Sequence, residues 1–322
     1  MKRKIEIFCT LGPKSLNKKF LNFTKGKITL VRLNLSHIDI SNLEKTISFI
    51  RHETNVPICI DTEGAQIRTK VKKRKKIKKG KRFKFFINEK DSLYPIEVFD
   101  QIDVGNKLLI GFESLTAIVT KKTNNYFECT ATSEGYLENN KGVYVANKKI
   151  KLNYLTPKDL EAIKIAKQLK IKNFALSFTN SLNDIVKFSH LLPKSRKIYK
   201  FESKSALKNW KELLNSGNEF LIDRGDLSKE TSIEEIPFYQ RKIVKDVKSK
   251  NKKVFIATNF LESMIKNPEP TRAEANDIYS SLEMGASGLV LAAETAIGDY
   301  PFRSVSFLKK IIKNFRKTKL NF

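Results

Sequence analysis

Short hydrophobic runs alternate with longer amphipathic stretches along most of this chain. The runs are rich in β-branched and aromatic residues, as buried strands are, and the stretches between them repeat apolar residues at helical spacing. Eight runs are expected to be strands: Ile5–Leu11, Ile28–Leu35, Pro57–Thr62, Asn173–Phe178, Lys197–Glu202, Glu219–Arg224, Val254–Thr258 and Gly288–Ala292. The expected helices include Ile40–Glu53, Lys158–Leu169, Asn183–Leu191, Lys204–Leu214, Ile236–Lys250 and Arg272–Met284. Eight alternations of strand and helix predict the α/β class and a (β/α)8 TIM barrel of parallel strands.

The alternation breaks between residues 69 and 149, where no helical period appears. Short runs of alternating polarity replace it, such as RFKFFI and LTAIVTKK, and turn-forming residues such as Asn139-Asn140 separate them. This pattern predicts a small antiparallel β-barrel domain, a lid, inserted after the third strand at residues 69–149. Residues 1–68 and 150–322 are then left for the catalytic barrel.

The chain carries a formal charge of +28, which raises the question of a nucleic-acid partner. Lysine is spread over the whole sequence and arginine is scarce beside it, whereas nucleic-acid readers use arginine heavily. A compositional drift toward lysine therefore explains the charge better than nucleic-acid binding does. The densest basic run, Lys70–Lys84, is the exception, and its interspersed apolar residues suggest strands with a basic outer face.

No apolar run approaches the roughly 18 residues of a membrane span, so no membrane partner is expected. Cys9, Cys59 and Cys129 are odd in number and scattered, and each lies in a strand-like context. We therefore expect reduced thiols in a cytoplasmic protein and no disulfide framework.

Polar side chains occur at the C-terminal ends of nearly all the predicted strands, where barrels of this kind carry their chemistry. They are Thr10, Arg32, Asn34, Ser36, Asp61, Thr62, Lys200, Glu202, Asp226, Thr258 and Glu294. The alternation Arg32-x-Asn34-x-Ser36 turns three of them to one face of a strand. Each residue alone could instead cap a helix or form a turn. Together they favour a site for an anion and a metal ion, because carboxylates such as Glu202 and Asp226 suit Mg²⁺.

The motifs of the chain resemble those of the pyruvate kinases over most of its length. FCTLGPKS resembles the family's Cys-Thr-x-Gly-Pro-x-Ser, VRLNLSH its Arg-x-Asn-x-Ser-His, and IDTEGAQIRT its Asp-Thr-x-Gly-x-x-Ile-Arg-Thr. Further along, KFE stands for Lys-Ile-Glu, DRGDL for Ala-Arg-Gly-Asp-Leu, and FIATNFLESMIKNPEPTRAEANDI parallels the family's signature. LTPKDLEAI, FALSF and AAETAIGDYP complete the series in the family's order. The order and the spacing make the resemblance specific.

The resemblance implies the glycolytic transfer of a phosphoryl group from phosphoenolpyruvate to ADP, which gives pyruvate and ATP. It implies catalytic roles for Lys200, Arg32 and Thr258, substrate contacts from these three with Gly225 and Asp226, and Mg²⁺ ligation by Glu202 and Asp226. It also implies nucleotide contacts from Thr10, His37, Arg68 and Lys158 and a K⁺ site of Asn34, Ser36, Asp61 and Thr62.

Three departures from the family's motifs bear on activity. Ala292 stands where the family has a serine associated with protonating the enolate. Gln66 stands where the family has either a glutamate, which goes with K⁺ dependence, or a lysine, which goes with K⁺ independence. In the expected lid, Gly111-Phe112-Glu113 takes the place of an Asp-Asp-Gly. We therefore expect a slow enzyme whose K⁺ requirement the sequence leaves open.

The sequence stops after the eighth expected helix, before the region that holds the family's C-terminal regulatory domain. An unregulated homo-oligomer, a dimer through the barrel, is the resulting expectation. Two alternatives remain open. One is a catalytically impaired paralogue with a binding role, for example toward RNA, and the other is a Mg²⁺-dependent 2-oxo acid aldolase on the same barrel. Lys200 and the expected lid argue against the aldolase, since that class needs no nucleotide lid.

Overall fold

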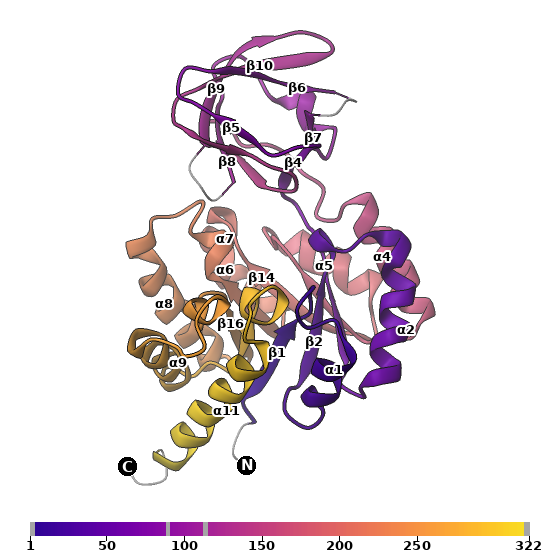
Figure 1. Cartoon of the computed structure of the whole chain (residues 1–322), viewed down its shortest axis with the longest axis vertical. Helices are drawn as coiled ribbons and strands as arrows, with labels where there is room; N and C mark the ends of the chain where they lie inside the picture. The colour runs from indigo at the N-terminus through magenta and orange to yellow at the C-terminus, as the bar shows by residue number, and fades with distance from the viewer. Residues whose placement is uncertain (1–3, 88–90, 112–114, 319–322) are drawn as a thin grey trace. The chain divides into compact units, whose positions relative to one another are not determined.

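The computed structural model describes residues 4–87, 91–111 and 115–318 and divides into two compact units (Figure 1). The first unit contains residues 1–64 and 157–322, and the second contains residues 65–156. The second unit extends a few residues beyond the expected range 69–149, because β4 (Ile67–Val71) already pairs with β7 (Asp91–Tyr94) in its sheet. Each unit has an apolar core of its own.

The first unit is a closed barrel of eight parallel strands in the order β1-β17-β16-β15-β14-β13-β3-β2. The strands are β1 (Glu6–Thr10), β2 (Leu30–Asn34), β3 (Ile58–Asp61), β13 (Asn173–Leu176), β14 (Arg196–Phe201), β15 (Glu219–Asp223), β16 (Lys253–Ala257) and β17 (Gly288–Leu291). The first and last strands pair with each other and close the ring. The predicted (β/α)8 barrel is therefore confirmed, and each strand lies within or beside an expected apolar run.

Apolar side chains fill the interior of the barrel. The rings of Phe8 and Phe255 have centroids 4.6 Å apart, and Cys59, Ile198 and Val290 belong to the same buried cluster. All three cysteines of the chain are buried and free. Because the interior is a packed core, polar chemistry is left to the ends of the strands.

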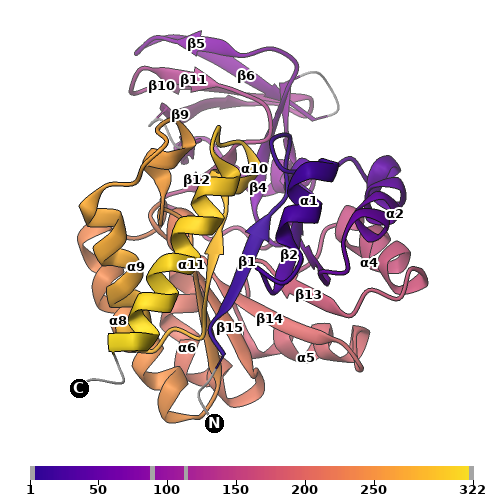
Figure 2. The same ribbon diagram turned by 60° about the horizontal axis from the view of Figure 1, so that its bottom comes forward.

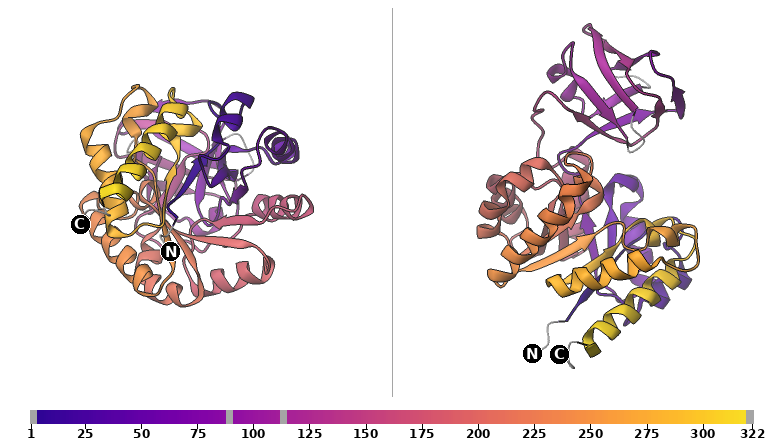
Figure 3. Two further views of the ribbon diagram at one scale, coloured as in Figure 1. Left: turned by 90° about the horizontal axis from the view of Figure 1, so that it is seen from below. Right: turned by 90° about the vertical axis from the view of Figure 1, so that its left-hand side faces the viewer.

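Helices surround the strands on the outside of the barrel (Figures 2 and 3). The longer ones are α1 (Lys18–Thr24), α2 (Leu43–Glu53), α4 (Pro157–Gln168), α5 (Leu182–Leu191), α6 (Lys204–Ser216), α8 (Ile236–Ser249), α9 (Arg272–Met284) and α11 (Pro301–Thr318). Single turns follow several strands: η1 (Leu35–His37), η2 (Ile40–Asn42), α7 (Arg224–Leu227), η3 (Ile233–Glu235), η4 (Glu262–Ile265) and α10 (Ala293–Ala296). The last helix, α11, packs against α9 and also against α1, so the C-terminal helix of the barrel lies beside its first helix (Figure 2).

The second unit is an antiparallel sheet of seven strands in the order β6-β10-β9-β8-β12-β4-β7, beside a separate pair, β11 and β5. The strands not yet named are β5 (Lys75–Ile77), β6 (Arg82–Phe86), β8 (Lys107–Ile110), β9 (Leu115–Lys122), β10 (Tyr126–Ala131), β11 (Gly135–Leu137) and β12 (Gly142–Val145). The edge strands β6 and β7 contact each other, so the sheet nearly closes into a barrel. An antiparallel β domain inserted after the third barrel strand is thereby confirmed.

The insert also contains one helical turn that the pattern of the sequence did not predict. The single turn α3 (Val98–Gln101) packs Val98 and Phe99 into the core of the second unit. A helix of one turn is too short to show a hydrophobic period, so the pattern along the sequence could not reveal it. The motif Gly111-Phe112-Glu113 extends beyond the described residues and is not placed by the structure.

The basic run Lys70–Lys84 belongs to this unit and has two different faces. Val71 and Ile77 are buried in its core, whereas most of the lysines of the run are exposed. Lys76 forms an exposed ion pair with Glu134 across the β5–β11 pair, with the charged atoms 2.8 Å apart. The run is thus explained by strands with a solvated outer face.

Among the helices of the described residues, none has the length and apolar character needed to cross a bilayer.

Candidate active site

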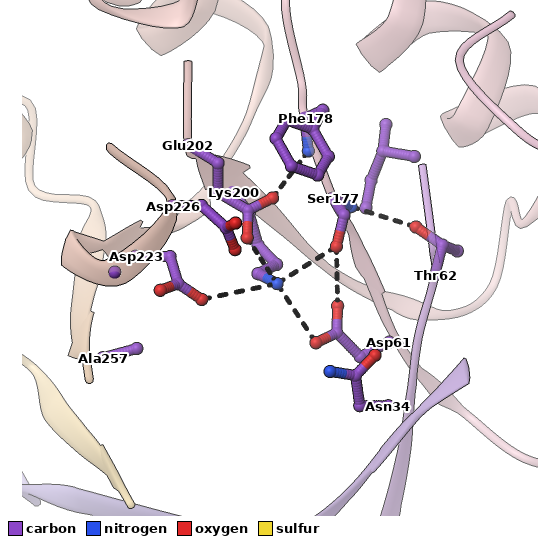
Figure 4. Close-up of polar contacts among 12 residues, drawn as sticks. Asn34, Asp61, Thr62, Ser177, Phe178, Lys200, Glu202, Asp223, Asp226 and Ala257 are labelled. Carbon is purple, nitrogen blue, oxygen red and sulfur yellow. Dashed lines mark hydrogen bonds and ion pairs between the residues drawn. The ribbon is translucent and has the colours of Figure 1, made fainter. Parts of the chain in front are cut away.

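A buried lysine, Lys200, lies at the C-terminal end of β14 among polar side chains (Figure 4). It is 3% exposed. Its Nζ lies 2.7 Å from Glu202 Oε1, and it donates hydrogen bonds to Asp61 Oδ2 at 3.2 Å and to Ser177 Oγ at 3.0 Å. Because Lys200 and Glu202 are two residues apart, the strand turns both to the same side. Three residues expected at the strand ends, Lys200, Glu202 and Asp61, therefore meet in one cluster.

The second buried cation of the cluster is Arg32, in the middle of β2. Its Nε donates to Asp61 Oδ2, and its Nη1 donates to Thr10 Oγ1 at 3.0 Å. Ser177 Oγ donates to the other oxygen of Asp61 at 3.2 Å. Asp61 is thus the shared counter-ion that holds both cations in place.

The charges of the cluster shift one another's pKa values. Burial lowers the pKa of Lys200, but the carboxylates of Asp61 and Glu202 outweigh burial and hold it above its ordinary value. Burial likewise opposes the charge of Arg32, and Asp61 again raises its pKa on balance. For Asp61 itself, burial raises the pKa, while the two cations outweigh that effect and lower it. Burial and the neighbouring carboxylates raise the pKa of Glu202 to about 8, although Lys200 opposes the rise.

Three carboxylates form a group beside this lysine. Glu202 follows β14, Asp223 ends β15 and Asp226 lies in α7, and one oxygen from each lies within 4.8 Å of the other two. The backbone N–H of Phe178 donates to Glu202 Oε2 at 2.7 Å, and Lys229 forms an ion pair with Asp226. Glu202 and Asp223 are buried, whereas Asp226 is partly exposed. Hard oxygen ligands at this spacing can hold a divalent cation.

The loop after β15 meets the end of β16 beside the carboxylates. The backbone N–H of Gly225 donates to Thr258 Oγ1 at 2.8 Å. Thr258 has a φ of 72°, a left-handed conformation that is uncommon for a β-branched residue. Arg224 holds it there, with Nε donating to the Thr258 carbonyl at 3.1 Å and Nη1 donating to Asp277 Oδ2 at 2.7 Å. A Cβ added at Gly225 would lie 3.5 Å from Thr258 Oγ1 and 3.6 Å from Asp223 Oδ1.

The four residues expected to bind K⁺ lie at the ends of β2 and β3, where Asn34 and Asp61 are partners in register. Asn34 Oδ1 accepts from the backbone N–H of Ser36 at 3.0 Å, which caps the helical turn after β2. Thr62 Oγ1 accepts from the backbone N–H of Ser177 at 3.0 Å. These contacts are structural, and a role of the four residues in K⁺ binding stays a prediction.

The residues expected to contact a nucleotide are divided between the two units. Thr10, His37 and Lys158 belong to the barrel, and Arg68 belongs to the second unit. Lys158 Nζ lies 3.0 Å from Glu63 Oε1, so its charge is paired within the barrel. The nucleotide contacts also stay a prediction.

Glu294, which the sequence places at the end of the last strand, has a role in the fold. It is buried, and its two oxygens accept hydrogen bonds from the backbone N–H groups of Leu261 at 3.2 Å and Ala292 at 2.7 Å. Burial raises the pKa of Glu294 on balance, although these hydrogen bonds oppose the rise. The carboxylate therefore ties the loop after β16 to the loop after β17.

The family model described as "Pyruvate kinase, barrel domain" matches residues 2–305 of this chain. The chain belongs to the pyruvate kinase family. The pyruvate kinase of Methanocaldococcus jannaschii is 34% identical over 322 residues, which cover 97% of this chain and 70% of that protein. The pyruvate kinase of Geobacillus stearothermophilus is 32% identical over 332 residues, and plastidial pyruvate kinase 3 of Arabidopsis thaliana is 29% identical over 328 residues. The chain covers 57% of the length of each of these last two relatives.

Two polar residues of this pyruvate kinase barrel were missed from the sequence. Asp223 is the first residue of DRGDL, where the family's motif has alanine, and that departure was the available signal. Ser177 lies in FALSF, one residue beyond the end of β13. A serine in a sequence does not by itself indicate a functional site. Ser177 is assigned to the site only by its hydrogen bonds with Lys200 and Asp61.

Proposed function

We propose that this chain transfers a phosphoryl group from phosphoenolpyruvate to ADP and releases pyruvate and ATP. The observation that carries the proposal is the buried Lys200, held between Asp61 and Glu202 at the C-terminal end of a pyruvate kinase barrel. In this reaction the bond between phosphorus and the enol oxygen breaks, and a bond from phosphorus to a terminal oxygen of ADP forms. The enolate that is left then takes a proton at carbon and becomes pyruvate.

The two buried cations would act on the phosphoryl group. Lys200 and Arg32 are held by the same carboxylate, Asp61, so their charges are fixed before any substrate arrives. Fixed charges stabilise a transferring phosphoryl group without the cost of reorganising around it. Their raised pKa values keep both groups protonated at neutral pH.

The divalent cation that the family implies fits the residues present. Glu202 and Asp226 would hold it, because their oxygens approach within 4.8 Å and Glu202 is buried beside further negative charge. Mg²⁺ at this place would supply positive charge against the enolate and phosphoryl oxygens. The chain's own contribution is to orient the carboxylates, and the backbone N–H of Phe178 does so for Glu202.

The substrate carboxylate would lie at the loop after β15. The backbone N–H groups of Gly225 and Asp226 and the hydroxyl of Thr258 are the proposed donors. Gly225 already directs its N–H at the Thr258 hydroxyl, and an anion bound there would replace or share that hydrogen bond. The absence of a side chain at Gly225 keeps the space next to these donors open.

Nucleotide binding by Thr10, His37, Arg68 and Lys158, and K⁺ binding by Asn34, Ser36, Asp61 and Thr62, are further parts of the proposal. They rest on the positions of these residues in the family's motifs. The K⁺ part is tested by replacing K⁺ with tetramethylammonium at constant ionic strength in the assay below. The expected dimer through the barrel is tested by sedimentation equilibrium.

The activity itself is tested with a coupled assay that follows pyruvate through lactate dehydrogenase and NADH. We expect pyruvate from the purified chain only when phosphoenolpyruvate, ADP and Mg²⁺ are all present. Asp226→Asn, which keeps the shape of the side chain and removes its charge, serves as the matched background. A parental rate no higher than that of Asp226→Asn would refute the proposal. In that case, RNA binding that weakens as salt rises would favour the impaired paralogue.

A further inference from the structure

One oxygen of the buried Asp223 carboxylate has no hydrogen-bond partner among the described residues. The residue is 3% exposed, and within the described part of the chain its Oδ1 accepts no hydrogen bond. Its Oδ2 lies 3.7 Å from Lys200 Nζ, which is longer than a hydrogen bond. A buried carboxylate with an unpartnered oxygen is costly, so it calls for a cation.

Lys200 forms only a long ion pair with Asp223 Oδ2, at 3.7 Å, because its ammonium lies closer to other groups. Glu202 Oε1 lies 2.7 Å from its Nζ, and Asp61 and Ser177 accept its hydrogen bonds at 3.2 and 3.0 Å. The ammonium group thus makes one close ion pair and two hydrogen bonds, and all three of these contacts are shorter than its 3.7 Å distance to Asp223. Asp223 therefore contributes to the field around Lys200 without being its hydrogen-bonded counter-ion.

Asp223 instead shares the spacing of the metal-ligand group. Its oxygen lies within 4.8 Å of an oxygen of Glu202 and of an oxygen of Asp226, and the three side chains come from two neighbouring strand ends (Figure 4). Oxygens on opposite sides of one Mg²⁺ are about 4.2 Å apart, so small side-chain rotations would bring the three onto one ion. Three carboxylates leave about three positions of an octahedral ion for oxygens of a substrate or water.

We propose that Asp223 is a third carboxylate ligand at the divalent-cation site of Glu202 and Asp226, and that the chain binds this cation without substrate. The inference deepens the proposed function, since the cation is the one required for phosphoryl transfer. A third anionic ligand should raise the affinity, because the number of charged ligands and the rigidity of the site set how tightly a hard cation binds. The aspartate stands where the motif of the family has alanine, so the extra ligand belongs to this chain.

The test is a titration of the chelator-treated full chain with Mn²⁺, followed by the electron paramagnetic resonance signal of free Mn²⁺. Neither phosphoenolpyruvate nor ADP is added. We expect Asp223→Ala and the isosteric Asp223→Asn each to weaken Mn²⁺ binding about tenfold or more, as loss of one anionic ligand does. Circular dichroism of each variant checks the fold, and Asp223→Asn keeps the packing if Asp223→Ala does not fold.

The matched control is Glu230→Gln. Glu230 is a partly buried carboxylate whose charge reaches Asp226, but it accepts from the backbone N–H of Lys204 at 2.8 Å and lies outside the ligand group. It should change the Mn²⁺ affinity by less than about threefold, since only a distant charge is lost. An equal effect of Glu230→Gln and Asp223→Asn would show that Asp223 acts through its charge alone and would overturn the proposal.

Two other outcomes would also overturn it. One is Mn²⁺ binding by both Asp223 variants at parental affinity while Asp226→Asn binds weakly. The other is a parental chain that binds no Mn²⁺ at millimolar concentration. The Mn²⁺ titration and the activity assay test different proposals. If the parental chain is inactive but the Asp223 variants bind Mn²⁺ more weakly than it does, only the proposed function is refuted. Parental Mn²⁺ binding in the Asp223 variants of an active chain would refute this inference alone.

Discussion

At the scale of single residues, the proposed chemistry depends on the charge of Lys200. Lys200→Met should lower kcat by at least about 10²–10³-fold, because a preorganised charge on the transferring group is lost. It should also lower the free energy of unfolding by about 3–5 kcal/mol, since Asp61 and Glu202 lose a buried counter-ion. Coupled kinetics and urea unfolding measure the two effects separately.

The control for this prediction is Lys197→Met on the same strand. Lys197 donates to the carbonyl groups of Leu192 and Ser195, both at 2.9 Å, and lies at the other end of β14. Its loss should leave kcat near the parental value. Near-parental turnover in a folded Lys200→Met variant would rule out the role assigned to Lys200.

Gly225 provides a second prediction at this scale. Its Cβ position meets neighbours only at 3.5 Å or more, and its φ lies outside the left-handed region, so Gly225→Ala should fold. Stability should stay equal or rise by up to about 1 kcal/mol, because alanine loses less backbone entropy in a helical turn. The methyl group would, however, fill space beside Thr258 Oγ1 and Asp223 Oδ1. We expect KM for phosphoenolpyruvate to rise with little change in melting temperature, and an unchanged KM would remove Gly225 from the substrate site.

The sequence predicted individual site residues where their chemistry was visible in a motif. Lys200 and Glu202 could be placed together because both lie at one strand end. Asp223 was missed because its neighbour Asp226 already filled the expected ligand role, and only geometry shows both near Glu202. For Asn34 the sequence allowed either a role in the site or a capping role. In the structure its side-chain oxygen caps the turn after β2.

At the level of elements, Asp159 at the start of α4 holds the segment that follows β3 within the barrel unit. Its Oδ1 and Oδ2 accept from the backbone N–H groups of Glu63 at 2.7 Å and Gly64 at 3.1 Å. Asp159→Ala would leave two buried donors without this partner, at a cost of about 1–3 kcal/mol for each. Urea unfolding should therefore show a loss of about 2–5 kcal/mol. Glu161→Ala, at an exposed position on the same helix, should change stability by less than about 0.5 kcal/mol. A similarly small effect of Asp159→Ala would refute the stabilising role assigned to these two hydrogen bonds.

Element types followed from the periodicity, and the sequence also carries local capping signals at some helix ends. The start of α9 is an example, since Thr271 and Glu274 form a capping box that the sequence displays. The single turn α3 was missed because four residues carry no period, and its place is decided by the core that Val98 and Phe99 join. Short elements of this kind depend on tertiary packing, which a local pattern does not contain.

At the scale of the whole molecule, the insert and the barrel have separate apolar cores. Gly64 and Asp159 are hydrogen-bonded to each other, so the chain leaves the barrel and returns to it at nearly the same point. Replacing residues 65–156 with a short Gly/Ser linker should therefore leave a barrel that folds cooperatively, as domains with their own cores do. Circular dichroism and thermal unfolding measure this.

The shortened chain should lose transfer to ADP, because Arg68 and the rest of the insert are removed. It should keep the Mn²⁺ affinity of the full chain, since Glu202, Asp223 and Asp226 all belong to the barrel. A shortened chain that is unfolded would show that the barrel does not fold without the insert. A shortened chain that transfers phosphoryl groups to ADP at the parental rate would show that the insert is not needed for this transfer.

Phosphoryl transfer from phosphoenolpyruvate to ADP at the Lys200 cluster can be followed by ³¹P NMR of a single reaction mixture. With the full chain and Mg²⁺, the phosphoenolpyruvate signal should decline while ATP signals rise by the same amount, and pyruvate should appear in equal quantity. The same mixture with folded Lys200→Met should stay unchanged over that time. Pyruvate without ATP, or no loss of phosphoenolpyruvate with the folded parental chain, would show that the chain does not catalyse this transfer.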